Sequence, residues 1–327
     1  MKKLSELTKV DLENKKVIVR GDLDVSELSE NDIRLQRLIP TIKYLLDNKA
    51  QVVLIGHRGR PSHKATADKS SLDLMSLVPV LEKMIGTKEG WSLKENLRFD
   101  PREEANNDEF AKELANLADI YVNEAFSVCH REHASIVGIP KYLPSYAGLN
   151  LEKEIENLSR VFDPIKPLVI LISGVKKDKL EMIEPLSNLA DKILVGGRLP
   201  DFLGDNTISV RNQNGKVIIG NLVMDKEDIT VNTIEKFKQE IAKAKTIVLA
   251  GVLGKYEDEG HSQGTKAIFD AVGEAPATFK IVGGGDSLVA IAKYNLQEKF
   301  DWISVGGGAM LEFLTKKTLV GIEALLN

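Results

Sequence analysis

Two glycine triplets near the end of the chain decide its fold class: Gly283-Gly284-Gly285-Asp286 and Gly306-Gly307-Gly308-Ala309. Each triplet follows a β-rich apolar run, Phe279–Val282 or Trp302–Val305, and precedes a stretch with helical spacing, over 287–294 or 310–315. This repeated order of strand, glycine turn and helix is typical of an α/β fold built on a parallel sheet.

The same order suits the binding of an anion. A helix that begins directly after a glycine turn directs free backbone N–H groups and a positive helix dipole toward one point. Glycine lets the backbone approach closely because it lacks a Cβ and tolerates positive φ. Two such turns with the acidic Asp286 indicate a polyphosphate whose metal this carboxylate would hold. Two tight turns that bind nothing remain the alternative.

The composition is that of an ordinary globular enzyme. The chain has 327 residues, enough for two domains, with 43% hydrophobic and 28% charged residues. A net charge of −4 argues against bulk binding to nucleic acid or to a membrane surface. The single cysteine, Cys129, excludes an internal disulfide framework, and Met1–Glu6 lacks the apolar segment of a signal peptide. We expect a cytoplasmic monomer with no nucleic-acid or membrane partner.

Strands alternate with helices along most of the chain, which predicts largely parallel sheets. Apolar runs predict strands at 16–20, 51–55, 120–122, 168–172, 192–195 and 246–249, besides those before the two triplets. Helical spacing predicts helices at 34–47, 72–84, 109–117 and 148–162. The last of these stops at Asp163-Pro164-Ile165-Lys166-Pro167, where two prolines break helical geometry and mark a domain junction. The stretch 204–220, rich in Asn and Gly, is expected to be irregular or a hairpin.

Cationic residues gather at the expected strand ends and helix starts of the first half: Arg34, His57, Arg60, Arg98, Arg131 and His133. Arginine suits phosphate and carboxylate because its planar fork bonds two oxygens at once. Taken singly, an arginine in such a place is more often a solvated surface residue than a ligand-binding one, so the prediction depends on the convergence of the set. His130 and His133 could instead form a metal pair, although no third ligand follows at helical spacing. Asp22 and Asp24 could orient an arginine, accept from a substrate hydroxyl, or cap a turn.

Taken in order, these segments resemble the phosphoglycerate kinase family over nearly the whole chain. The matching pieces are Val19–Val25, Asn31–Leu35, Gly56–Pro61, Glu95–Phe99, Val122–Phe126, His130–Ser135, Gly283–Ser287 and Gly306–Ala309. The resemblance implies two doubly wound, Rossmann-like parallel-sheet domains joined by a hinge helix. It implies a phosphoglycerate-binding domain over 1–147, the helix and hinge over 148–165, a nucleotide-binding domain over 166–314, and a segment over 315–327 that returns to the first domain.

The implied activity is phosphoryl transfer between ATP or ADP and 3-phosphoglycerate or 1,3-bisphosphoglycerate, in line and upon domain closure, with Mg²⁺. The substrate-binding positions that match the family are Asp22, Asp24, Arg34, His57, Arg60, Arg98 and Arg131. Those implied to act on the moving phosphoryl group are Arg34, Lys176, Gly306, Gly307 and Gly308. Nucleotide binding is implied for Gly174, Lys176, Lys179, Gly196, Gly197, Leu253, Glu257, Gly283, Gly284, Gly285, Asp286 and Ser287, with Asp286 at the metal.

Several positions depart from the family pattern. Asp24 stands where an asparagine is usual, so a carboxylate would face an anionic substrate. The lysine loop, Ser173–Lys179, is one residue short, which leaves either Lys176 or Val175 at the transfer position; we favour Lys176. The loop Ala250–Gly254 lacks the usual asparagine and proline, Val305 replaces a hydroxyl residue, and most of the missing length falls between 197 and 230. Because the changes other than Asp24 gather on the nucleotide side, a catalytically degenerate binding protein is the alternative function.

Overall fold

The computed structural model describes residues 1–25, 27–60, 71–203 and 215–326. The chain divides into two compact units: unit 1 comprises Met1–Ile155 and Thr318–Asn327, and unit 2 comprises Glu156–Lys317. Helix α6 (Leu149–Ser159), with the 3₁₀ turn Arg160–Phe162 after it, starts in unit 1 and ends in unit 2. None of the helices in the described ranges is both long and apolar enough to span a membrane.

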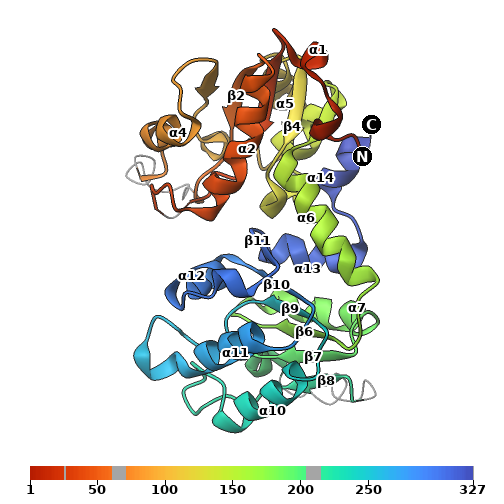
Figure 1. Ribbon diagram of the computed structural model, residues 1–327. Helices are drawn as coiled ribbons and strands as arrows, with labels where there is room; N and C mark the ends of the chain where they lie inside the picture. The colour runs from red at the N-terminus through yellow and green to blue at the C-terminus, as the bar shows by residue number, and fades with distance from the viewer. Residues whose placement is uncertain (26, 61–70, 204–214, 327) are drawn as a thin grey trace. The chain divides into compact units, whose positions relative to one another are not determined.

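Unit 1 is built on a five-stranded parallel sheet (Figure 1). Its strands are β1 (Lys16–Arg20), β2 (Gln51–Ile55), β3 (Trp91–Leu93), β4 (Ile120–Asn123) and β5 (Ser145–Ala147). They lie in the order β3-β2-β1-β4-β5, every neighbouring pair being parallel. This order reverses direction between β1 and β4. Ligands of doubly wound sheets bind outside the carboxyl ends of the strands at such a reversal.

The helices of unit 1 are placed by their apolar faces. They are α1 (Lys9–Leu12), α2 (Ile33–Asp47), α4 (Val78–Ile85), α5 (Asp108–Ala115) and α14 (Val320–Glu323), with a π-helical turn over Ala134–Gly138. In α2, Leu35, Leu38, Ile42 and Leu45 are buried at helical spacing and belong to the core cluster that covers the sheet. Helix α4 begins at Val78 after a 3₁₀ turn, six residues later than the sequence pattern predicts.

Unit 2 repeats the same design with six parallel strands (Figure 1). These are β6 (Leu168–Ile172), β7 (Lys192–Val195), β8 (Val217–Ile219), β9 (Thr246–Ala250), β10 (Phe279–Gly283) and β11 (Trp302–Ser304), in the order β11-β10-β9-β6-β7-β8. The helices are α7 (Ile183–Ser187), α8 (Leu199–Leu203), α10 (Val231–Ile241), α11 (Gln263–Glu274), α12 (Gly285–Lys293) and α13 (Gly307–Lys316). The order in which strands are added reverses between β6 and β9. Ligands are therefore expected to bind at the carboxyl ends of these two strands.

The expectation for 204–220 was incomplete. Residues 204–214 lie outside the described part of the chain, but 217–219 form β8, which pairs in parallel with β7 through Ile193↔Val217 and Val195↔Ile219. Three residues are too few to show a periodic pattern, and the glycine content around them concealed the strand. The α/β class with two parallel sheets is confirmed.

Candidate active site

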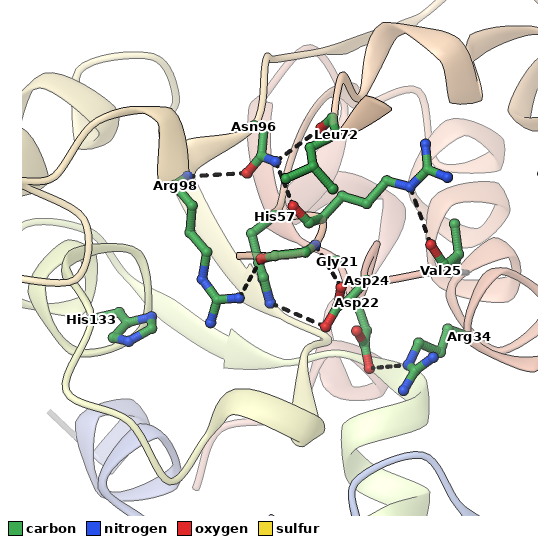
Figure 2. A network of polar contacts seen from close by, with 12 residues as sticks. Gly21, Asp22, Asp24, Val25, Arg34, His57, Leu72, Asn96, Arg98 and His133 are labelled. Atoms are coloured by element: carbon green, nitrogen blue, oxygen red, sulfur yellow. Dashed lines mark hydrogen bonds and ion pairs between the residues drawn. The ribbon is translucent and has the colours of Figure 1, made fainter. Parts of the chain in front are cut away.

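Arg34 and Asp22 face each other at the carboxyl edge of the unit 1 sheet (Figure 2). Arg34 lies in the first turn of α2, whose start is fixed because the side chain of Asp32 accepts hydrogen bonds from the amides of Arg34 and Leu35. Nε of Arg34 is 3.3 Å from Oδ2 of Asp22. Burial disfavours the arginine charge, but nearby carboxylates, led by Asp22, outweigh it and raise the pKa of Arg34. Asp22 therefore holds a fully charged guanidinium at this edge.

His57 and Asp24 lie beside this pair (Figure 2). His57 follows β2 and is 2% exposed, and its Nε2 lies 3.7 Å from Oδ2 of Asp24. The other oxygen of Asp24 accepts a hydrogen bond from the amide of Gly59 at 2.7 Å. Gly59 has a φ of +62°, and a Cβ there would come within 2.4 Å of Leu72, so only glycine fits this turn. Asp24 thus caps the loop around Gly59, which carries Arg58 and Arg60.

Arg98 is held over the same loop from the opposite side. Its Nη1 donates to the backbone oxygen of Gly59 at 2.7 Å, and its Nε lies 3.0 Å from Oε1 of Glu104. Burial lowers the pKa of Arg98. Asn96 secures both segments, because its amide donates to the backbone oxygens of Arg58 and Leu72 and its Oδ1 accepts from the amide of Arg98. Figure 2 shows these side chains converging from separate loops.

Arg131 and Arg60 are the outer members of the expected set. Arg60 is exposed, and Arg131 is half-buried after the 3₁₀ turn Phe126–Val128. Burial and the charge of Arg60 lower the pKa of Arg131, which indicates that the two cations lie near each other. Like charges held together in this way favour an anionic ligand.

His133 belongs to a buried network instead of a metal pair. Its Nδ1 lies 3.8 Å from Oε1 of Glu103, and burial together with nearby arginines lowers the pKa of His133 to about 3. Within the described ranges, no group of three or more His, Cys, Asp or Glu side chains could hold a metal ion. His130 and His133 therefore have no third ligand among the described residues.

Arg20, at the end of β1, is a member of this site that the sequence did not reveal. It is fully buried, and its guanidinium contacts Nδ1 of His57 at 2.8 Å, Oγ of Ser135 at 2.9 Å and the backbone oxygen of Gly21 at 2.5 Å. A charged residue at the end of a strand is ordinarily solvated, so no pattern in the sequence marks it. The available signals were its place on the switch-point strand and within the matching piece Val19–Val25, and neither distinguishes it from its neighbours.

In unit 2 the glycine loops after the strands approach one another backbone to backbone. A Cβ at Gly251 would lie 2.2 Å from the backbone oxygen of Ser173, and one at Gly197 would lie 2.5 Å from the amide nitrogen of Gly174. Gly174, Gly197 and Gly251 all have positive φ. We call this set of loops the glycine cradle; it comprises Ser173-Gly174, Gly196-Gly197, Ala250-Gly251, Gly283-Gly284 and Gly306-Gly307-Gly308.

Helices α12 and α13 begin at the two triplets, as the sequence predicts. Gly284, with φ of +113°, precedes α12, and Gly306 precedes α13. A Cβ at Gly307 would lie 2.6 Å from Cα of Gly284, so the two helix starts are neighbours. Asp286 is exposed in the first turn of α12, whereas Ser287 is buried and its Oγ accepts from the amide of Gly251 at 3.1 Å. Two adjacent helix N-termini make this edge favourable for phosphate.

Lys179 supplies the cation of the cradle. Its Nζ donates to the backbone oxygens of Ser173 at 2.5 Å and Ala250 at 3.3 Å, between the ends of β6 and β9. Burial lowers the pKa of Lys179 to about 8, and the charge of Asp286 acts in the opposite direction. Lys176 is exposed at the start of the 3₁₀ turn Lys177–Met182, and Val175 is 63% exposed. The short lysine loop therefore places one lysine within the cradle and leaves the other in solvent.

The loop after β9 is shaped by Thr265. Its hydroxyl oxygen accepts from the amides of Leu253 at 3.1 Å and Gly254 at 2.9 Å, which fixes the backbone that carries Leu253. Leu253 is buried, and Glu257 is exposed further along the same loop. These residues lie in the loop that follows β9, the strand between β10 and β6.

The chain is similar to known proteins over both of its units. A family model described as "Phosphoglycerate kinase" matches residues 7–214 and 201–317. Proteins named phosphoglycerate kinase from Thermosipho africanus, Dictyoglomus turgidum and Fervidobacterium nodosum are 36%, 36% and 37% identical to this chain. These alignments cover 99–100% of this chain and 98–99% of each relative.

Two solved structures are similar over the same length. The phosphoglycerate kinase from Coxiella burnetii has a TM-score of 0.80 at 31% identity, and that from Pyrococcus horikoshii OT3 has 0.82 at 26% identity. They cover 99% and 100% of this chain, and 98% of each of those chains is covered. The alignment with the Thermosipho protein runs over 398 positions, so this 327-residue chain is a shortened relative. The chain belongs to the phosphoglycerate kinase family of enzymes.

Proposed function

We propose that this enzyme transfers a phosphoryl group between ATP and 3-phosphoglycerate, and in reverse from 1,3-bisphosphoglycerate to ADP, a step of glycolysis and gluconeogenesis. In the forward direction a carboxylate oxygen of 3-phosphoglycerate bonds to the γ-phosphorus while the bond to the β,γ-bridging oxygen breaks. The products are the acyl phosphate and ADP. A carboxylate is already ionised at neutral pH, so no general base is required.

The glycine cradle is the observation that carries this proposal. Its loops bring together two helix N-termini that have no side-chain cap, and the Nζ of Lys179 lies between β6 and β9 at the same edge. Phosphoryl transfer depends on placement and on neutralisation of charge, which such an edge supplies. We assign nucleotide binding to Gly174, Lys176, Lys179, Gly196, Gly197, Leu253, Glu257, Gly283, Gly284, Gly285, Asp286 and Ser287.

We assign phosphoglycerate binding to a domain over residues 1–147, to which we propose that the segment over 315–327 returns; this domain lies within unit 1 apart from 315–317. Asp22 orients Arg34, and the Gly59 loop presents His57 and Arg98 around Asp24. A ligand with a phosphate and a carboxylate needs several cations in fixed positions, and arginine forks provide directional bonds to both groups. Arg60 and Arg131 complete this set.

The residues present fit a magnesium ion. Mg²⁺ prefers one or two carboxylates together with phosphate oxygens and water, and Asp286 is an exposed carboxylate in the first turn of α12. A bound Mg²⁺ neutralises charge on the phosphate oxygens. Arg34, Lys176 and the amides of Gly306, Gly307 and Gly308 are proposed to stabilise the phosphoryl group in flight, and closure about the hinge over 148–165 to exclude water.

A coupled assay with ATP, Mg²⁺ and 3-phosphoglycerate tests the proposal, with 2-phosphoglycerate as the matched acceptor control. Turnover with 3-phosphoglycerate but not with 2-phosphoglycerate, each in the presence of ATP and Mg²⁺, supports the assignment. Absence of turnover with every nucleoside triphosphate would refute it. Calorimetric titration then separates the alternative, because binding of 3-phosphoglycerate without binding of any nucleotide is the behaviour expected of a degenerate binding protein.

A further inference from the structure

The guanidinium of Arg20 touches the buried ring nitrogen of His57. Nη2 of Arg20 lies 2.8 Å from Nδ1 of His57, and both side chains are at most 2% exposed. Arginine carries five N–H donors and no acceptor, and it stays charged in proteins. Nδ1 must therefore accept this hydrogen bond through its lone pair, so the proton of a neutral His57 is on Nε2.

Arg20 is itself held from behind by a second buried contact. Its Nε donates to Oγ of Ser135 at 2.9 Å, and Ser135 in turn donates to Glu103 through its hydroxyl at 2.5 Å and its amide at 2.9 Å. Glu103 is fully buried, so a carboxylate balances the arginine charge through one hydroxyl. The hydroxyl of Tyr121 donates to the backbone oxygen of Ser135 at 2.8 Å and fixes the turn. The guanidinium cannot move away without breaking its own buried hydrogen bonds to Ser135, Gly21 and His57.

The charged surroundings of His57 are consistent with a neutral ring. Oδ2 of Asp24 faces Nε2 at 3.7 Å, and the positive or titratable groups that act on the ring are Arg20, Arg98, His133 and Arg131. Burial first, and these cations next, lower the pKa of His57 well below its ordinary value of 6.5. A second proton would have to enter at Nδ1, the position that Arg20 occupies.

We propose that Arg20 is a positioning residue that holds His57 as the neutral tautomer with its proton on Nε2, so that His57 donates a hydrogen bond to an anionic oxygen of the substrate. His57 then acts neither as a base nor as a cation. The contact with substrate rests on the proposed function, whereas the tautomer rests on the geometry of Arg20 alone.

Long-range ¹H–¹⁵N correlation spectra of the intact enzyme test the tautomer directly, with His57→Gln used to assign the signals. We expect a pyrrole-like Nε2 and a pyridine-like Nδ1 for His57, unchanged at about pH 6, where an unperturbed histidine is mostly protonated. A pyridine-like Nε2, or two protonated nitrogens at that pH, would overturn the proposal.

Arg20→Met removes the donor, and Arg58→Met is the matched control because Arg58 donates to Val25 and Ser76 instead. We expect Arg20→Met to mix the tautomers, to let His57 titrate, and to raise KM for 3-phosphoglycerate about tenfold, the usual effect of one lost charged hydrogen bond. Arg58→Met should keep the wild-type tautomer. If Arg20→Met does not fold, Arg20→Lys tests the same point: an ammonium group also has donors and no acceptor, so a His57 with its proton on Nδ1 there would contradict the assignment.

Turnover is measured separately from these spectra. If His57 carries its proton on Nδ1 in an enzyme that turns over 3-phosphoglycerate, the role of Arg20 is overturned and the proposed function stays intact. The expected tautomer in a protein without turnover would instead refute the proposed function and support the action of Arg20 on His57.

Discussion

The Nζ of Lys179 lies 2.5 Å from the backbone oxygen of Ser173, whereas Lys176, three residues earlier, is exposed. The two lysines of this short loop therefore lie in different environments. We expect Lys179→Met to weaken ATP binding about tenfold or more, because the cradle loses its buried cation. Lys176→Met should lower kcat more than it lowers nucleotide affinity, because its side chain is exposed outside the cradle. Calorimetry and steady-state kinetics on both variants check this, and the reverse pattern would exchange the two roles.

Arg34 is expected to act on the moving phosphoryl group. Asp22 keeps its guanidinium charged and aimed from the first turn of α2. Arg34→Ala should lower kcat about 10³-fold, the scale found for arginines that stabilise phosphoryl transfer. Arg37→Ala, one helical turn further along α2, is the matched control and should retain nearly full turnover. A rise in KM with an unchanged kcat would restrict Arg34 to substrate binding.

Asp24 places a negative charge where the family pattern has an amide. One oxygen of Asp24 caps the Gly59 loop, and an asparagine oxygen can do the same. Asp24→Asn should therefore preserve the fold while removing about 1 kcal/mol of repulsion toward an anionic ligand, a severalfold decrease in Kd for 3-phosphoglycerate. Titrations at low and high salt check this, since the gain should shrink as screening increases. Weaker binding would show that the carboxylate contacts the substrate favourably.

The strands that the sequence predicts each contain an apolar run that is mostly buried, and Leu168–Ile172 is the longest fully apolar example. Strands β3 and β5 have three residues each, too few for a periodic signal, and they were missed for the same reason as β8. The hydrophobic pattern therefore predicted the central strands of each sheet and the edge strand β11, which the second glycine triplet follows, but not the edge strands β3, β5 and β8.

The candidate site divides in a similar way. Residues in short motifs, such as the triplets, could be recognised because glycine has few other reasons to recur after a strand. Arg20 and Glu124 carry charges that sequence reasoning assigns to solvent, and only the fold shows that both are buried. Lys176 and Lys179 are equally cationic in the sequence, and the backbone path of the loop alone distinguishes them.

Glu124 makes stability depend on pH. It is 2% exposed at the end of β4, where its carboxylate accepts hydrogen bonds from the hydroxyl of Thr41 and from the amides of Asn150 and Leu151 at the start of α6. Burial raises the pKa of Glu124 from 4.5 to about 7 despite these donors. The folded chain therefore binds this proton more tightly than the unfolded chain.

Stability should accordingly fall as pH rises from about 4.5 to about 7, by up to about 3 kcal/mol from this group. The glutamine of Glu124→Gln cannot titrate. The free energy of unfolding of this variant should therefore vary less over that pH range than the free energy of unfolding of the wild type. Urea unfolding of both proteins at several pH values measures the difference between the two curves. Parallel curves would mean that Glu124 has an ordinary pKa.

Gly308 separates folding from phosphate binding. It is exposed in the first turn of α13, and a Cβ at this position would meet nothing within 4 Å. Gly308→Ala should therefore fold at least as stably as the wild type, with a gain of up to about 1 kcal/mol from reduced backbone entropy. If the amides of this turn face the phosphoryl group, the added methyl group obstructs the approach, and kcat should fall about 10²-fold, as with loss of one stabilising donor.

Gly307→Ala provides the contrast within the same turn. Its Cβ would lie 2.6 Å from Cα of Gly284, so the two helix starts would have to separate, and both stability and kcat should decrease. Thermal unfolding and steady-state turnover of the two variants are measured side by side. A fully active Gly308→Ala enzyme would contradict a role of this turn in the transfer step, because the added methyl group would then obstruct nothing.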